Sequence, residues 1–208
     1  MIYDITRRVT PKTAVWPGDT PFGFDLLTSI AGGGSVNLTT LHMSAHTGTH
    51  ADAYWHFEND GAHPAEMPLE AYIGPAQVVT LTREDGGITP DDLRDLEIAQ
   101  ATRVLFHTPV SDLPDHVWPT RFPYLTIELI DMLAAQGVRL IGLDSPSVDA
   151  FHSKDLTCHH RLRARGIVNL ESLQLSGVPD EVYELVALPL KLDGVCGSPV
   201  RAILREIL

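Results

Sequence analysis

Four side chains that bind divalent metal ions or transfer protons recur at even spacing in the first third of the chain: His46, His50, Asp52 and His56. On a straight strand, residues at even spacing share one face. A strand rises roughly 3.3 Å per residue, so His46 and His50 would lie roughly 13 Å apart, too far to bind one ion. A helix would bring the two imidazoles together, but Thr47, Gly48 and Thr49 make a poor helix.

A bend at Gly48 would solve this spacing problem. Glycine adopts turn dihedrals without steric cost, so an extended segment bent there would gather two imidazoles and the Asp52 carboxylate. Imidazole nitrogen and carboxylate oxygen suit zinc or manganese, and Asp52 has two oxygens with which to bridge two ions. The alternative is a histidine-rich surface loop without metal. The regular addition of Asp52 and His56, with a glycine at the required bend, favours the metal site.

A second group of candidate ligands follows much later, in Cys158-His159-His160 and Glu171. Three protein ligands and an open position already support hydrolysis, and further ligands from this group would allow a two-metal site. Taken alone the group is ambiguous, because both histidines could lie on a helix surface and Glu171 at a strand end. Cys158 is expected to be a small buried filler rather than a soft ligand.

The elements that must position these residues are mostly short, β-branched strands. Strands outnumber helices, and the two alternate only in the middle third. This pattern predicts one α/β domain over residues 1–208, with a mixed sheet and long loops in the first 75 residues. Three helices are predicted: one opened by Thr89-Pro90-Asp91, one from Thr126 to Ala135 ended by Gly137, and one over Asp155–Arg165 stopped at Gly166. The predicted strands are Ile2–Thr6, Phe22–Leu27, Val36–Ser44, Ala76–Leu81, Arg103–His107, Val138–Leu143, Ile167–Leu170, Tyr183–Leu188 and Val200–Leu204.

Composition and charge narrow the class of protein. The 208 residues are 44% hydrophobic and 20% charged, which is ordinary for a soluble globular domain. The formal net charge of -12 argues against nucleic acid or an anionic membrane as the main partner, because both require a basic surface. No apolar run approaches the ~20 residues that span a bilayer, and the N-terminus reads as a strand rather than a signal peptide. Two cysteines cannot build a disulfide framework, so a cytoplasmic protein is expected.

Six motifs occur in order along the chain: Trp16-Pro-Gly-Asp19-Thr-Pro21, His46-Thr-Gly-Thr-His50-Ala-Asp52-x-x-x-His56-Phe57, Leu69-x-x-Tyr72-x-Gly74-Pro75, Gly142-Leu-Asp144-Ser-Pro146-Ser-Val-Asp149, Ala187-Leu-Pro189-Leu-Lys191 and Ser198-Pro199-Val-Arg201-Ala202. In these motifs the chain resembles the metal-dependent cyclase superfamily and, within it, the bacterial kynurenine formamidases. The resemblance covers nearly the whole chain. It implies a swivelling β/β/α fold with a mixed β-sheet core, usually as a homodimer, with zinc commonly bound.

The resemblance also implies a role for each matched residue. The metal ligands would be His46, His50 and Asp52, with Asp52 bridging, together with His159 and Glu171 for a second ion. Two zinc ions per subunit are then expected, with manganese as an alternative. The family's catalytic histidine falls on His56, and a residue that lines the substrate pocket falls on Trp16. The family usually has proline where this chain has Tyr54, a change that removes a backbone restraint and adds bulk beside the catalytic histidine.

The activity that the resemblance implies is hydrolysis of N-formyl-L-kynurenine to L-kynurenine and formate. His56 would act as the general acid that protonates the departing aniline nitrogen, or alternatively as a fourth metal ligand. Two other functions remain open from the sequence: a related hydrolase that opens a cyclic amide such as isatin, and a metal-binding protein without turnover. Trp55 and Trp118 are expected to be structural, and Asp144 and Asp149 to cap loops, with support of the metal ligands as the alternative.

Overall fold

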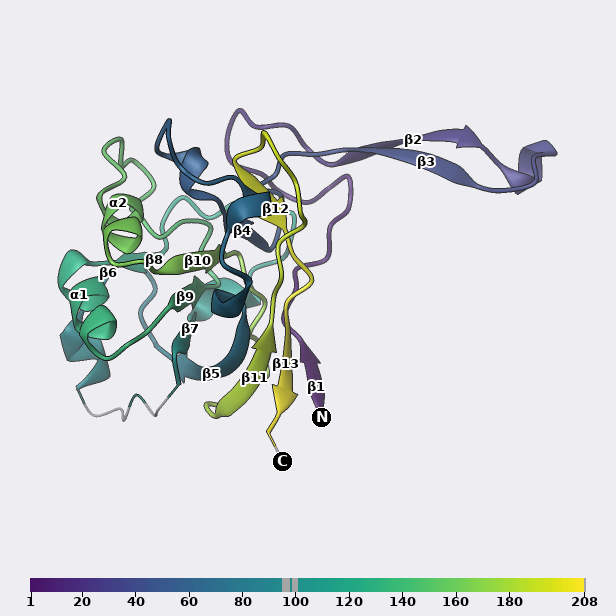
Figure 1. The fold of residues 1–208 in the computed structure, drawn as a ribbon. Coiled ribbons are helices and arrows are strands. Elements are labelled where there is room, and N and C mark those ends of the chain that lie inside the picture. Colours follow the sequence, from purple (N-terminus) through teal and green to yellow (C-terminus); the bar gives the residue numbers. More distant parts are fainter. Residues whose placement is uncertain (95–97, 99–100, 208) are drawn as a thin grey trace.

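A curled, nine-stranded mixed sheet organises the chain (Figure 1). The computed structural model describes residues 1–94, 98 and 101–207. Four neighbouring strands at the centre of the sheet, β5, β7, β9 and β10, run parallel, and the outer pairs are antiparallel. In sheet order the strands are β1 (Ile2–Asp4), β13 (Ile203–Glu206), β11 (Val182–Val186), β5 (Ile73–Thr80), β7 (Arg103–His107), β9 (Leu140–Leu143), β10 (Val168–Glu171), β4 (His50–Asp52) and β12 (Gly197–Pro199).

The sheet has an apolar core on each face. Successive side chains of a strand point to opposite faces, so Val104 and Phe106 of β7 join one core while Leu105 joins the other. Helices α1 (Ile127–Ala135) and α2 (Thr157–Ala164) cover the first core, to which they add residues such as Leu129 and Leu162. The parallel strands are therefore buried on both sides, as is usual for parallel sheets.

The remaining elements are small. Strands β2 (Gly23–Thr28) and β3 (Leu38–His42) form a hairpin that projects well away from the sheet (Figure 1), and β6 (Gly86–Ile88) pairs in parallel with β8 (Pro123–Leu125). No helix among the described residues is long and apolar enough to cross a membrane. Six short 3₁₀ helices complete the described elements: η1 (Ile30–Gly32), η2 (Tyr54–His56), η3 (Pro64–Glu66), η4 (Leu69–Ala71), η5 (Pro90–Leu93) and η6 (Pro109–Asp112).

The predicted α/β class with a mixed sheet is confirmed. The helix expected from Thr126 is α1, whose first turn is capped by the Thr126 hydroxyl, which accepts from the Leu129 amide at 3.3 Å. The helix opened at Thr89 is the short 3₁₀ helix η5. The third helix begins two residues later than predicted, at Thr157, because the preceding Leu156 has a left-handed φ of 44°.

The predicted strand Val200–Leu204 is wrong in its bounds, and four strands were missed. The segment predicted as Val200–Leu204 includes the break between two strands. The chain pairs with β4 up to Pro199, as β12, and with β11 from Ile203 onward, as β13. The missed strands, β4, β6, β8 and β12, are each three residues long. Strands this short show no alternation of their own, so only their partners in the sheet define them.

Candidate functional site

The bend predicted at Gly48 is present and has a left-handed φ of 65°. After the bend the chain enters β4, where His50 and Asp52 are buried between β10 and β12. The register places His50 directly opposite Glu171 of β10. The turn also folds His46 back, so that its ring centroid lies 4.9 Å from that of His50. The bend thus brings together two histidines that a straight strand would hold apart.

Asp52 lies at the centre of the cluster and offers a different oxygen to each side. Its Oδ1 lies 3.0 Å from His46 Nδ1 and 3.3 Å from His50 Nε2. Its Oδ2 lies 3.3 Å from Nε2 of His159, which α2 supplies. Glu171 closes the cluster, with Oε2 3.4 Å from His50 Nε2 and Oε1 3.5 Å from His159 Nε2. The structure therefore gathers all five predicted metal ligands in one place.

Each of the three imidazoles uses its second ring nitrogen as an anchor. His50 Nδ1 lies 2.9 Å from the carbonyl oxygen of Gly48, and His159 Nδ1 lies 2.7 Å from the Asp149 carboxylate. The Nε2 of His46 lies 3.1 Å from Cys196 Sγ. Metal-binding histidines are commonly oriented by such a contact, which leaves the inward nitrogen free to bind. Asp149 thus supports a candidate ligand.

Two other carboxylate roles are resolved by the hydrogen bonds. Asp149 also accepts from the amides of Cys158 and His159 at the start of α2, so its capping and supporting roles coexist. Asp144 accepts from the amides and hydroxyls of Thr108 and Ser111, which confirms the expected loop-capping role.

The carboxylates of the cluster are held in the ionised form. Burial would raise the pKa of Asp52, but its close contacts with the imidazoles of His159, His46 and His50 hold that pKa well below its ordinary value. Burial opposes charge on His50, yet its contacts with Asp52 and Glu171 raise its pKa to about 9. The same balance, with Asp52 as the main partner, raises the pKa of His46 to about 10. Positive charge is therefore strongly favoured at this point of the sheet.

The donor set fits a divalent metal ion. The residues form two inner groups, and within each group the ligand atoms all lie within 4.8 Å of one another. One inner group is His46, His50 and Asp52, and the other is Asp52, His159 and Glu171. His50 Nε2 and Asp52 Oδ1 are buried and have no hydrogen-bond partner among the described residues. Unsatisfied buried polar atoms are costly, and a cation between them would remove that cost. Imidazole and carboxylate donors suit zinc or manganese.

A cavity of about 460 Å³ opens onto this cluster. Trp16 and Trp118 form part of its wall and contact each other edge to face, with ring centroids 5.6 Å apart. The Phe151 ring packs against Trp16, with ring centroids 5.2 Å apart. His46, His50, His159 and Glu171 line the same cavity. A flat aromatic molecule bound against the tryptophans would therefore share this cavity with the candidate metal ligands.

His56 lies at the edge of the cavity, at the end of η2. Its ring centroid is 4.2 Å from that of His46, and its side chain is exposed. It belongs to neither of the two inner ligand groups. This position beside the cluster is compatible with the predicted role in proton transfer.

Comparison with known proteins places this site in a family. The sequence model of the family described as "Putative cyclase" matches residues 3–150. The chain belongs to this cyclase family. A protein named kynurenine formamidase, from Salinibacter ruber (strain DSM 13855 / M31), is 44% identical over 206 residues, which cover 99% of this chain and 97% of the relative.

Solved structures share the fold of this cyclase-family chain. A predicted metal-dependent hydrolase from Bacillus stearothermophilus is 30% identical, with a TM-score of 0.81 over 98% of this chain and 97% of the other. Isatin hydrolase A from Labrenzia aggregata, solved with benzyl benzoate, is 26% identical, with a TM-score of 0.84 over 98% and 93% of the two chains. The name of the Bacillus stearothermophilus protein thus describes a metal-dependent hydrolase, and the cluster of candidate metal ligands in this chain agrees with that description.

Two residues of the site escaped sequence reasoning. Trp118 was expected to be only structural, but it lines the cavity, and none of the sequence motifs includes Cys196, whose Sγ lies 3.1 Å from His46 Nε2. Hydrogen bonds from His46 and His56 lower the pKa of the Cys196 thiol to about 6. Neither residue stands in a regular pattern with the ligands, so only the folded chain brings them to the site.

The family departure at Tyr54 does not narrow the cavity. Tyr54 is not among the residues that line it. The ring instead packs against Phe57 and under the Arg163 guanidinium, and its hydroxyl lies 3.5 Å from the carbonyl oxygen of Ile167. The added bulk of tyrosine is therefore accommodated behind the site.

The bend gives a first testable prediction. In Gly48→Ala, the new Cβ would meet Val9 Cγ2 at 2.9 Å in a left-handed backbone, so the protein should lose about 1–3 kcal/mol of stability and bind zinc more weakly. Chemical denaturation and zinc competition with a chelator measure the two effects. Gly137→Ala is the matched control, because Gly137 has a φ of 84° and open space around it. The role of the bend is refuted if both variants retain zinc equally well.

Proposed function

We propose that this chain hydrolyses N-formyl-L-kynurenine to L-kynurenine and formate. The observation that carries the proposal is the 44% identity with a kynurenine formamidase over nearly the full length of both chains. The site supports it, because a cavity with two tryptophans in its wall opens onto a buried cluster of histidines and carboxylates. The aromatic ring of the substrate would lie against Trp16 and Trp118, with its formyl group toward the cluster.

The proposal includes two zinc ions per chain, with manganese as the alternative. His46, His50 and Asp52 would hold one ion, and Asp52, His159 and Glu171 the other. When bound, such ions lower the pKa of water toward ~7 and so supply a nucleophile at neutral pH. The family resemblance also leads us to propose that the chain is a single domain of the swivelling β/β/α type.

The contribution of the chain's own side chains follows from their positions. The aromatic wall orients the substrate, and the leaving aniline nitrogen must receive a proton as the amide bond breaks. His56 is close to the cluster and exposed to the cavity, so it can carry that proton. A protein that only stores or senses metal would not need a titratable group in that place.

A second hydrolase function has support from one structure. Isatin hydrolase A shares this fold at 26% identity, and opening a cyclic amide demands the same attack on a carbonyl carbon. The two reactions differ after bond cleavage, because the ring-opened product keeps its amine attached. The ligand cluster serves both reactions, so substrate assays must separate them.

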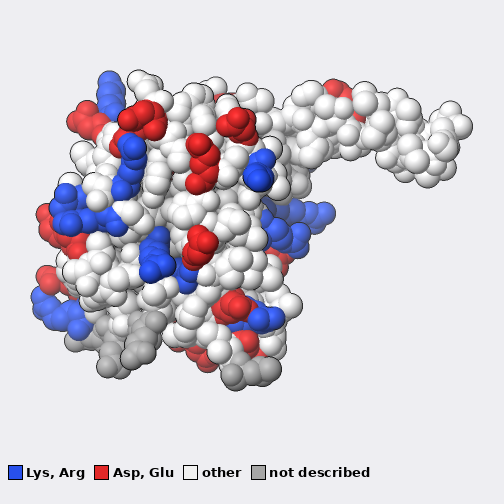
Figure 2. All heavy atoms as spheres, viewed as in Figure 1, with Lys and Arg blue, Asp and Glu red and all other residues white. Residues whose placement is uncertain are grey.

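We further propose that the chain forms a homodimer through the β2–β3 hairpin. Phe24, Leu26 and Leu41 are at least half exposed, and the register places Phe24 opposite Leu41 on one face of the hairpin. Residues 22–42 contain no lysine or arginine, and the projecting arm in Figure 2 is mostly uncharged on the face shown. Such a protruding apolar surface is typical of an interface.

The substrate prediction is tested by following kynurenine absorbance after N-formyl-L-kynurenine is added to the zinc-loaded protein. Isatin and formanilide are assayed alongside at matched concentrations. We expect formylkynurenine to give the highest kcat/KM, because the chain is 44% identical to a kynurenine formamidase and the cavity offers two tryptophans for its aromatic ring. Efficient isatin opening without formylkynurenine turnover would instead select the second function.

The role of His56 is tested by His56→Ala. We expect the variant to bind about two zinc ions per chain, as the wild type does, and to lose turnover roughly a hundredfold to ten-thousandfold. Elemental analysis and the kynurenine assay provide the two readouts. Loss of one ion together with activity would show that His56 is a ligand and not the proton donor.

The dimer prediction is tested with a Leu26→Asp, Leu41→Asp double variant. Light scattering after size-exclusion chromatography should give a dimer for the wild type and a monomer for the variant, since burying two new charges opposes association. Leu69→Asp is the control, because Leu69 is equally exposed but lies outside the hairpin. A monomeric wild type at all concentrations would refute the proposal.

A further inference from the structure

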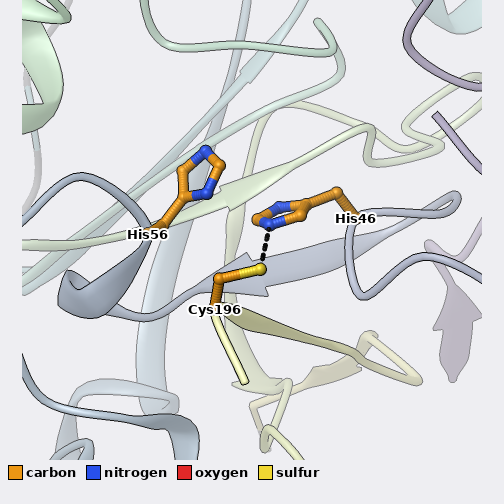
Figure 3. A group of neighbouring side chains, drawn as sticks. All are labelled: His46, His56 and Cys196. Atoms are coloured by element: carbon orange, nitrogen blue, oxygen red, sulfur yellow. Dashed lines mark hydrogen bonds between the residues drawn. The ribbon is translucent and has the colours of Figure 1, made fainter. Parts of the chain in front are cut away.

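A third cluster of metal-binding side chains lies just outside the two inner groups. His46, His56 and Cys196 come from the turn before β4, from η2 and from the loop before β12, and their side chains converge in Figure 3. Their ligand atoms all lie within 4.8 Å of one another. His46 Nε2 is 3.1 Å from Cys196 Sγ, and the two imidazole centroids are 4.2 Å apart. No step of the proposed reaction uses the thiol.

The donor chemistry of this outer cluster differs from that of the inner groups. The inner groups combine imidazole with carboxylate oxygen, whereas the outer cluster offers two imidazole nitrogens and one sulfur. Soft thiolate ligands select thiophilic cations, and carboxylates select harder ones. An ion can also reach the cluster, because His56 is exposed, Cys196 is partly exposed, and both histidines line the cavity.

We propose that His46, His56 and Cys196 form a separate, inhibitory site for thiophilic divalent cations such as Cd²⁺ or excess Zn²⁺. Binding would form bonds from the metal to two imidazole nitrogens and to sulfur, and the thiol proton would leave to solvent. The inhibitory part of this inference rests on the proposed hydrolase function, but the existence of the site does not.

Inhibition follows because the outer site uses two histidines that the reaction also needs: His46 for an inner ion and His56 for proton transfer. A neutral imidazole has one nitrogen lone pair available for a metal, and His46 turns Nδ1 toward Asp52 and Nε2 toward Cys196. An ion held through Nε2 therefore competes with an inner ion for the same ring. The same ion would occupy His56, which could then no longer deliver a proton.

The alternative role for Cys196 is an anchor only. In that case the sulfur accepts a hydrogen bond from His46 Nε2–H and orients the ring, as Asp149 does for His159. The anchor predicts no bond between sulfur and metal, so spectroscopy separates the two roles.

The test is a Cd²⁺ titration of the zinc-loaded protein, followed by the ultraviolet charge-transfer absorption of a cadmium–thiolate bond. We expect this absorption to saturate at about one equivalent per chain and to be lost in Cys196→Ser and Cys196→Ala. Cys158→Ser is the matched control and should retain it, because Cys158 is buried against the carbonyl oxygen of Leu125. Circular dichroism checks that each variant is folded.

A wild type without the charge-transfer absorption would overturn the proposal, and so would a Cys196→Ser variant that keeps it. Weaker zinc binding in Cys196→Ser without any wild-type absorption would establish the anchor instead. If formylkynurenine is a substrate, Cd²⁺ should inhibit the wild type at concentrations roughly tenfold or more below those for Cys196→Ser. A protein that shows the absorption but no formamidase activity would refute the proposed function and leave the outer site standing.

Discussion

The burial of two carboxylates, Asp52 and Glu171, is the constraint on which the rest of the site depends. Both lie inside the sheet, where an uncompensated charge is very costly. Three imidazoles surround them, and Asn169 donates to Asp52 at 2.7 Å and to Glu171 at 3.2 Å. These partners compensate much of the buried negative charge but leave Asp52 Oδ1 without a hydrogen bond among the described residues. The fold thus holds negative charge in a place where a cation is needed.

This constraint explains several features of the surrounding chain. The three-residue strand β4 delivers His50 and Asp52, and it is held in register between β10 and β12. Gly197 of β12 lies opposite Asp52, and a Cβ there would lie 3.0 Å from His46 Cε1, so a side chain at this position would press on the His46 ring. The short outer strands therefore fix the position of the cluster more than they extend the sheet.

Much of the inner cluster was predictable from the sequence, because its residues follow a local pattern. Even spacing around Gly48 predicts the bend and the convergence of His46 with Asp52. The pairing with His159 and Glu171 depended on family resemblance, since local spacing cannot show which distant strands become neighbours. Trp118 and Cys196 were missed for the same reason. Strands β4, β6, β8 and β12 were missed because three residues carry no periodic signal.

The cavity shows how members of one fold can act on different amides. The inner cluster would contact only the carbonyl group under attack. Selectivity among amides must therefore come from the cavity wall that holds the rest of the substrate. Here the wall supplies the Trp16 and Trp118 rings, and Asp19 adds a carboxylate. None of the described residues that line the cavity is a lysine or arginine. An amino-acid substrate would therefore find a charge partner for its ammonium group, whereas its carboxylate must be met by polar groups, by solvent or by a second copy of the chain. Because β3 leads through Ser44 directly into the turn that carries His46, association through the hairpin would bear on the geometry of the cluster itself.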